Sequence, residues 1–256
     1  MRGKATSISL GVTGIILFAV AAFPLRNMIV EGWYLWKLED ERDTGSLLNA
    51  ITNLGEYGTE KALLRLHKAL ASRPSGGLEL AWINNDGAEF GMDFVTGTTT
   101  VPDPAAPRVH YHRLKSLHRL EKRLGPAIVV QAFLRAIENG ALEHRTRVYL
   151  SAHIVLRTSK IGTRTVEFPS FWDELIATHP GMNWTEYSFA RPRMIRVMIS
   201  TLNSDDNASR EGAARVLGWC GREASAALHD LENLRNDDVE DVRLAASEAV
   251  QRIEAP

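Results

Sequence analysis

The sequence of 256 residues predicts an all-α fold, in which short helical pairs stack as an α-solenoid. It also predicts a β-hairpin insertion and an N-terminal transmembrane helix. Three observations lead to this class. Apolar residues recur mainly at three- and four-residue spacing, which is typical of amphipathic helices. The pattern L-G-x-x-G-x-E occurs twice, and an arginine-led pattern recurs after 33 residues, as in helical-repeat proteins.

The composition is that of a folded chain. Hydrophobic residues make up 45% and charged residues 24%, which excludes wholesale disorder. The net charge of −1 provides no positive field for nucleic acid, so we expect no nucleic-acid partner. Cys220 is the only cysteine, which excludes an internal disulfide and a cysteine-rich metal site.

The N-terminus has a charge-free segment, residues 5–25. It is just long enough to cross a membrane as a helix, since about 20 residues are needed. One interpretation is an uncleaved anchor that places the body outside the cytoplasm as a single-pass membrane protein. Another is a signal peptide cleaved near Ala19-Val20-Ala21, which would release a secreted or periplasmic protein. A third is a buried helix of the fold.

Nine apolar stripes predict the helices of the body, and short joints between them predict antiparallel pairs. Gly125-Pro126 ends one helix and begins the next, because Pro is favoured at the first helical position. The stripes run over residues 47–54, 63–70, 114–124, 128–137, 148–156, 194–202, 213–217, 228–234 and 242–253.

The repeated pattern begins at Leu54 and again at Leu217. In each copy we expect the leucine to pack under a corner between two helical pairs. We expect the glycines, Gly55 and Gly58 or Gly218 and Gly221, to adopt the left-handed backbone of a tight turn.

The second repetition places Arg210, Ala213 and Leu217 exactly one period of 33 before Arg243, Ala246 and Val250. Arg147, Leu150 and Ile154 have the same internal spacing. Asp205-Asp206 and Asp237-Asp238 precede two of these helices, where carboxylates cap free N–H groups.

The segments 202–231 and 236–250 resemble the HEAT-repeat family, including its short phycobilisome-lyase-type repeats. The resemblance is strongest over 192–254. It implies an armadillo-like helical architecture rather than a chemistry. In the family such aspartates and arginines tie neighbouring repeats, which implies Asp237 or Asp238 with Arg243, and Asp205 or Asp206 with Arg210.

The repeat pattern breaks between residues 75 and 108. Leu78, Leu80 and Trp82 alternate, Asn85-Asp86-Gly87 predicts a turn, and Ala88, Phe90, Met92 and Phe94 alternate again. A further strand is possible within 159–169. The predicted division is an anchor or signal peptide (1–32), a first HEAT-like unit (33–74), the hairpin insertion (75–108), central helices (109–158), an irregular insertion (159–191) and C-terminal repeats (192–256).

Candidate sites are few, and we predict no catalytic, cofactor or metal residue. His110, His112 and His118 are the best metal candidates, but their spacing does not place them on one helix face. Asp86, Glu89 and Asp93 lack the alternating oxygen ligands of a calcium loop. Cys220 has no recognisable base as a nucleophile. Asn183 and Asn207 begin glycosylation tripeptides, which matter only in a eukaryotic secretory pathway.

Two roles are open for each of the aromatic groups, and one role is expected for a basic group. Trp33, Tyr34 and Trp36 form either a membrane belt or the buried face of a first repeat helix, and we favour the buried face. The hairpin face of Trp82, Phe90, Met92 and Phe94 either grips a partner or covers the core. Arg191, Arg193 and Arg196 are expected to be a solvated helix start.

The leading functional hypothesis is a membrane-tethered, non-catalytic scaffold that binds proteins, whose partner the sequence does not identify. One alternative is a chromophore-lyase-like or other enzyme with a site where the insertions meet the solenoid. Another is a structural component of the cell envelope.

Overall fold

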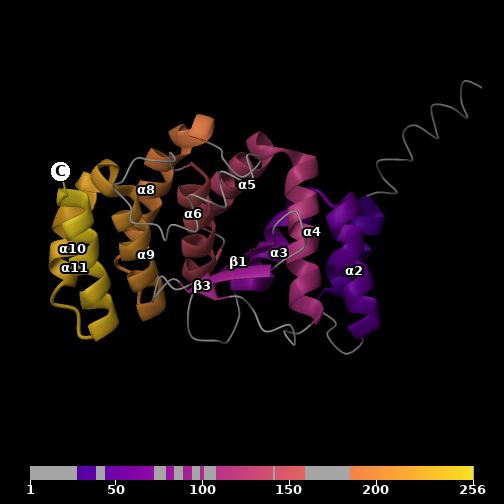
Figure 1. Cartoon of the computed structure of the whole chain (residues 1–256), viewed down its shortest axis with the longest axis horizontal. Coiled ribbons are helices and arrows are strands. Elements are labelled where there is room, and N and C mark those ends of the chain that lie inside the picture. The colour runs from indigo at the N-terminus through magenta and orange to yellow at the C-terminus, as the bar shows by residue number, and fades with distance from the viewer. Residues whose placement is uncertain are drawn as a thin grey trace, which may run out of the picture.

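Helices dominate the protein and stand side by side in a row (Figure 1). The structure is a computed structural model that describes residues 28–38, 44–71, 79–83, 89–93, 99–100, 108–140, 142–158 and 185–255. In Figure 1 the row runs from α2 at the indigo end to α10 and α11 at the yellow end.

Each apolar stripe found in the sequence lies in a helix, so the helical prediction is confirmed. Residues 28–37 are also helical. The α-helices are α2 (Thr44–Tyr57), α3 (Glu60–Ala71), α4 (Arg108–Leu124), α5 (Pro126–Glu138), α6 (His144–Thr158), α8 (Arg191–Thr201), α9 (Asn207–Cys220), α10 (Leu228–Leu234) and α11 (Glu240–Glu254), and the 3₁₀ helices are η2 (Thr185–Ala190) and η3 (Gly221–Ala227).

Local signals explain several of these boundaries. Gly125 has a positive φ of 80° and Pro126 begins α5, as the Gly-Pro pair predicts. The Asp206 carboxylate caps α9 by accepting a hydrogen bond from the Ser209 backbone N–H at 3.1 Å. α9 ends where Gly221 takes a φ of 55°, a conformation that favours glycine.

The repeated leucine-glycine pattern marks close helix contacts. Leu54 and Leu217 are both buried. A Cβ on Gly55 of α2 would lie 2.7 Å from Ser116 Cα of α4, and a Cβ on Gly218 of α9 would lie 2.9 Å from Ala249 Cα of α11. Of the four glycines only Gly221 has a positive φ, so the left-handed expectation is wrong for the other three. Two of those three, Gly55 and Gly218, let neighbouring helices approach.

The helices form two rows of packed neighbours. In one row α3 packs on α5, α5 on α8 and α8 on η3. In the other, α2 packs on α4, α6 on α9 and α9 on α11. Contacts between α3 and α4, α5 and α6, α8 and α9, and α10 and α11 join the two rows.

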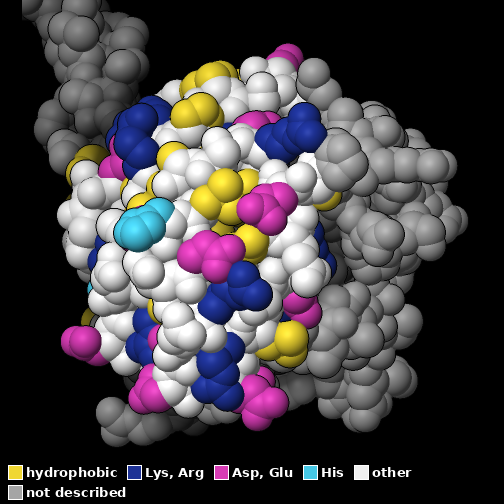
Figure 2. Space-filling model, turned by 90° about the vertical axis from the view of Figure 1, so that its left-hand side faces the viewer, with side chains coloured by type: hydrophobic (Ala, Val, Ile, Leu, Met, Phe, Trp, Pro, Cys, Tyr) yellow, Lys and Arg dark blue, Asp and Glu magenta, His cyan; other side chains and the backbone are white. Residues whose placement is uncertain are grey.

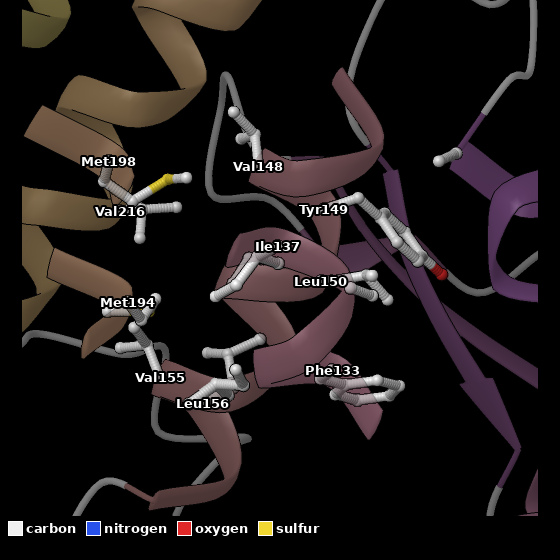
Figure 3. Packing of buried hydrophobic residues seen from close by; sticks show 14 of the residues in the cluster. Phe133, Ile137, Val148, Tyr149, Leu150, Val155, Leu156, Met194, Met198 and Val216 are labelled. Carbon is white, nitrogen blue, oxygen red and sulfur yellow. The ribbon is translucent and has the colours of Figure 1, made fainter. Parts of the chain in front are cut away.

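Apolar side chains fill the space between the α5–α6 pair and the α8–α9 pair. Met194 and Met198 of α8 and Val216 of α9 lie opposite Ile137, Val148 and Val155 of α5 and α6 (Figure 3). Phe133 and Tyr149 point the other way, away from α8 and α9. Burial of this kind contributes roughly 25 cal/mol for each Å² of apolar surface removed from water.

The predicted fold class is wrong as a whole, although its all-helical part agrees with the described helices. In the predicted hairpin region the structure has three strands, β1 (Glu79–Ile83), β2 (Glu89–Asp93) and β3 (Thr99–Thr100), joined antiparallel in that order. Trp82 is opposite Phe90 across β1 and β2, and Met92 of β2 is opposite Thr99 of β3. Pairing with β3 makes the insertion a small sheet instead of an isolated hairpin.

The transmembrane part of that class is not supported either. Among the described residues, no helix combines the length and the apolar character that a membrane crossing requires. Residues 5–25, where the span was predicted, lie outside the described ranges, as do the predicted turn at 85–87 and the possible strand at 159–169. The predicted domain boundaries stay predictions.

Candidate functional site

The residues proposed from the sequence as metal candidates do not form a site in the described part of the chain. No group of three or more His, Cys, Asp or Glu side chains there is placed to hold a metal ion. His112 and His118 lie half-buried on α4. The side chains of His110, Glu89 and Asp93, and the residues Asp86 and Asn183, lie outside the description.

Cys220 is buried at the end of α9. Burial raises the pKa of the Cys220 thiol to about 12, although the nearby Arg191 guanidinium opposes the shift. A thiol in this state is a poor nucleophile at neutral pH.

The basic cluster of α8 joins helices instead of forming a solvated helix start. Arg191 is buried, with Nε 3.3 Å from Glu223 Oε2 of η3. Arg193 Nε donates to Glu138 Oε1 of α5 at 2.7 Å. Arg196 is exposed and Arg193 is partly exposed, so the expectation is wrong for Arg191 alone.

The aspartate–arginine ties differ in their pairing from what the HEAT resemblance implies. Arg210 donates to both Asp237 carboxylate oxygens, at 2.9 and 3.0 Å, and contacts Asp205 only at its backbone carbonyl, at 3.3 Å. Arg243 donates to the backbone carbonyls of Asp237 and Asp238, at 2.7 and 3.1 Å. The carboxylate tie therefore joins α9 to the turn before the next long helix.

The most unusual constellation in the described part of the molecule is a buried group that sequence reasoning missed. We call His67, Glu121, His153 and Arg157 the histidine cluster. These residues come from α3, α4 and α6, so three helices separated in the sequence meet there. Phe133 and Tyr149 pack against the His67 ring, with centroids at 4.9 and 5.8 Å.

The cluster is a continuous chain of polar contacts. His67 Nε2 lies 3.0 Å from Glu121 Oε1. Arg157 Nη2 donates to Glu121 Oε2 at 2.8 Å, and Arg157 Nη1 is 2.9 Å from His153 Nδ1. The two imidazole rings lie edge to face with centroids 5.0 Å apart.

These partners determine where the ring protons lie. Burial lowers the pKa of His67, and the hydrogen bond to Glu121 only partly opposes this. Burial, followed by the charge of Arg157, lowers the pKa of His153 well below its ordinary value. Both rings are therefore neutral at pH 7. His67 carries its proton on Nε2 to donate to the carboxylate, and His153 carries its proton on Nε2 because Nδ1 accepts from arginine.

Glu121 stays ionised in this setting. Burial by itself raises the pKa of Glu121, but the Arg157 charge and the His67 hydrogen bond outweigh it, and the pKa lies below its ordinary value. The side chains of Glu121 and Arg157 are each 11% exposed. A nearly buried pair of this kind depends on complete hydrogen bonding, since removing one partner strands a charge.

The chemistry open to the cluster is limited by access. A carboxylate next to an imidazole is the pair that general-base catalysis uses. The free ring atoms are His67 Nδ1 and His153 Nε2, and neither has a hydrogen-bond partner among the described residues. His67 is 1% and His153 6% exposed, so the geometry favours a packing role.

Two sequence signals point to this cluster in retrospect. His67 occupies an apolar position of its helix, one residue after Leu66 and three before Leu70. His153 and Arg157 are four residues apart on α6, a helix with few exposed positions. Polar residues on a buried stripe indicate a buried network.

Comparison with known proteins adds no assignment. No family model and no curated protein matches this chain.

Proposed function

We propose that the helices form a non-catalytic scaffold of stacked, HEAT-like pairs that binds another protein. The observation that carries this proposal is one contact made three times. Arg147, Arg210 and Arg243 are each the fourth residue of a long helix, α6, α9 and α11. Each donates to the backbone carbonyl five residues earlier, at 3.1, 3.3 and 3.1 Å.

This recurrence supports a repeating unit because an arginine at the same helix position binds a backbone carbonyl of the preceding turn in each copy. A carbonyl in the turn before a helix has no partner within the helix, and a guanidinium in the first turn reaches it. The sequence groups these three arginines only by their spacing to the apolar residues that follow them. In the structure the three also make the same contact.

Ion pairs between successive helices also support a stacked array. In the first row Arg135 of α5 contacts Glu60 of α3, and Arg193 of α8 contacts Glu138 of α5. In the second row Arg215 of α9 lies 3.2 Å from Glu248 of α11. Such an array leaves an elongated surface that binds by shape.

The C-terminal end of the row has the polar surface that a terminal unit needs. Figure 2 shows this end with acidic and basic side chains interspersed and hydrophobic side chains in small, separate groups. Leu244 of α11 is exposed there, among Glu240 and Asp241. Terminal units with polar outer faces keep solenoids soluble.

Capture of a partner with matched surface variants tests the proposal. Ile128 of α5 and Leu244 of α11 are exposed large apolar side chains, 41% and 53% exposed. We expect Ile128→Asp or Leu244→Asp to lower the recovery of one specific crosslinked protein, without changing the melting temperature. Gln131→Glu and Gln251→Glu, at exposed positions of the same helices, are the controls.

Recovery that is the same in all four variants would contradict a binding role for these two faces. The transmembrane tether is no part of this proposal. The location of the protein stays a prediction to be tested in cells.

A further inference from the structure

The helix at residues 28–37 presents an apolar face to solvent. Ile29 is 71% exposed, Met28 62%, Trp36 56% and Trp33 48%. On its other side, Leu38 just after the helix is buried, and Tyr34 and Leu35 pack against the core. The preference for a buried role of the aromatic residues is therefore wrong for Trp33 and Trp36.

The charges of this helix are arranged with the same asymmetry. Glu31 is buried and accepts hydrogen bonds at 2.7 Å from the backbone N–H and from the hydroxyl of Thr59, just before α3. Lys37 is the only other charged residue of the helix, and its ammonium lies 5.7 Å from the Trp33 ring centroid and 5.1 Å from that of Trp36. The exposed face thus combines apolar and aromatic groups with one cation and no carboxylate.

We infer that this face lies on a lipid surface, with the helix parallel to the membrane plane. Tryptophan is enriched where hydrocarbon meets headgroups, and a lysine extends its ammonium towards phosphate. An exposed helix face of apolar and aromatic side chains can bury itself at the boundary between headgroups and acyl chains. The sequence adds a second observation, since the charge-free residues 5–25 end three positions before Met28.

A second copy of the chain fits this face less well. A stable dimer buries about 800 Å² and 20 to 30 residues on each partner. The helix offers five exposed apolar side chains, including Val30, along roughly 15 Å. The face is too small for a dimer but sufficient for a lipid contact.

Fluorescence quenching by lipid tests the inference with the full chain. The protein is reconstituted with vesicles of phosphatidylcholine and phosphatidylglycerol, with or without bromine on the acyl chains near the headgroups. We expect bromine to quench the parent, and Trp33→Phe combined with Trp36→Phe to remove most of that quenching while vesicle association is retained. Trp219→Phe is the control, because Trp219 is buried in α9.

Three outcomes would overturn the inference. The first is equal quenching in the parent and the double variant, and the second is no association of the parent with vesicles. The third is a dimer in detergent-free sedimentation that dissociates in the double variant, which would assign the face to a second copy. The inference is independent of the proposed scaffold, since partner capture and lipid quenching use different residues.

Discussion

The two halves of the molecule are held together in different ways. In the C-terminal half α9 is tied to α11 and to the turn before it by three contacts: Arg210 with Asp237, Arg215 with Glu248 and Gly218 with Ala249. In the N-terminal half, α3, α4 and α6 meet at the buried histidine cluster. The difference in range comes from the His67–Glu121 contact, which spans 54 residues, whereas the C-terminal ties span 27 to 33 residues and the Glu121–Arg157 contact spans 36. Contacts between residues close in the sequence can form early in folding. Contacts between residues far apart in the sequence form only after a longer segment of the chain has been ordered.

The largest expected effect is on the alkylation rate of Cys220, which lies buried in the C-terminal half. Because the pKa of Cys220 is about 12 and its side chain is buried, we expect alkylation of the native protein at pH 8 to be on the order of 10³-fold slower than that of the unfolded chain. Mass spectrometry after iodoacetamide treatment, with and without urea, measures both rates. Comparable rates would show that the corner between α9 and η3 opens readily.

Paired glycine variants compare the two halves directly. Gly218→Val and Gly55→Val each place a side chain against a neighbouring helix, so we expect each to reduce the free energy of unfolding by about 1–3 kcal/mol. Urea denaturation measures the loss. Gly32→Val is the control, since no atom lies within 4 Å of a Cβ there. A Gly218→Val protein as stable as the control would mean that α9 and α11 are not in close contact.

The arginine tie tests the C-terminal half further. Arg210 and Asp237 are 11% and 7% exposed, and Arg210→Met leaves the carboxylate without its guanidinium. We expect a loss of about 1–2 kcal/mol in thermal or urea unfolding. Arg235→Met removes a pair in which both side chains are about half exposed, and should cost less than about 0.5 kcal/mol. Equal losses would show that the tie between repeats is no stronger than a surface pair.

The smallest effect belongs to the histidine cluster and depends on pH. The folded-state pKa values of His67 and His153 lie below their ordinary value, so the unfolded chain binds more protons as the pH falls below about 6.5. The stability they provide is present above that pH and declines below it. Between pH 7 and 5.5 we expect the free energy of unfolding to fall, with the larger contribution from His153, whose pKa lies well below its ordinary value.

His153→Gln tests this assignment, because glutamine keeps an acceptor for Arg157 but does not titrate. Its free energy of unfolding should depend less on pH than that of the parent. His229→Gln, an exposed substitution on α10, should keep the full dependence. If both variants follow the parent, the pH dependence arises elsewhere.

Sequence reasoning predicted the parts of the fold that local rules govern. The apolar spacing located the helices, and Gly125-Pro126 located a boundary, because each signal acts within a few residues. The histidine cluster escaped because its members meet across helices. Trp33 and Trp36 were misassigned for a related reason: an apolar stripe does not tell which side faces the core. Gly218 was recognised as important, but its role depends on Ala249, 31 residues away.

One tie between α9 and α11 bears on how the units are ordered. Arg215 faces Glu248, and these positions are 33 residues apart, the same spacing that separates Arg210 from Arg243. With arginine at both positions, the two guanidinium groups would repel each other. The two positions instead carry opposite charges, so a helix with arginine in place of Glu248 would meet α9 with the wrong sign. The choice of neighbour is therefore encoded in the difference between the two helices.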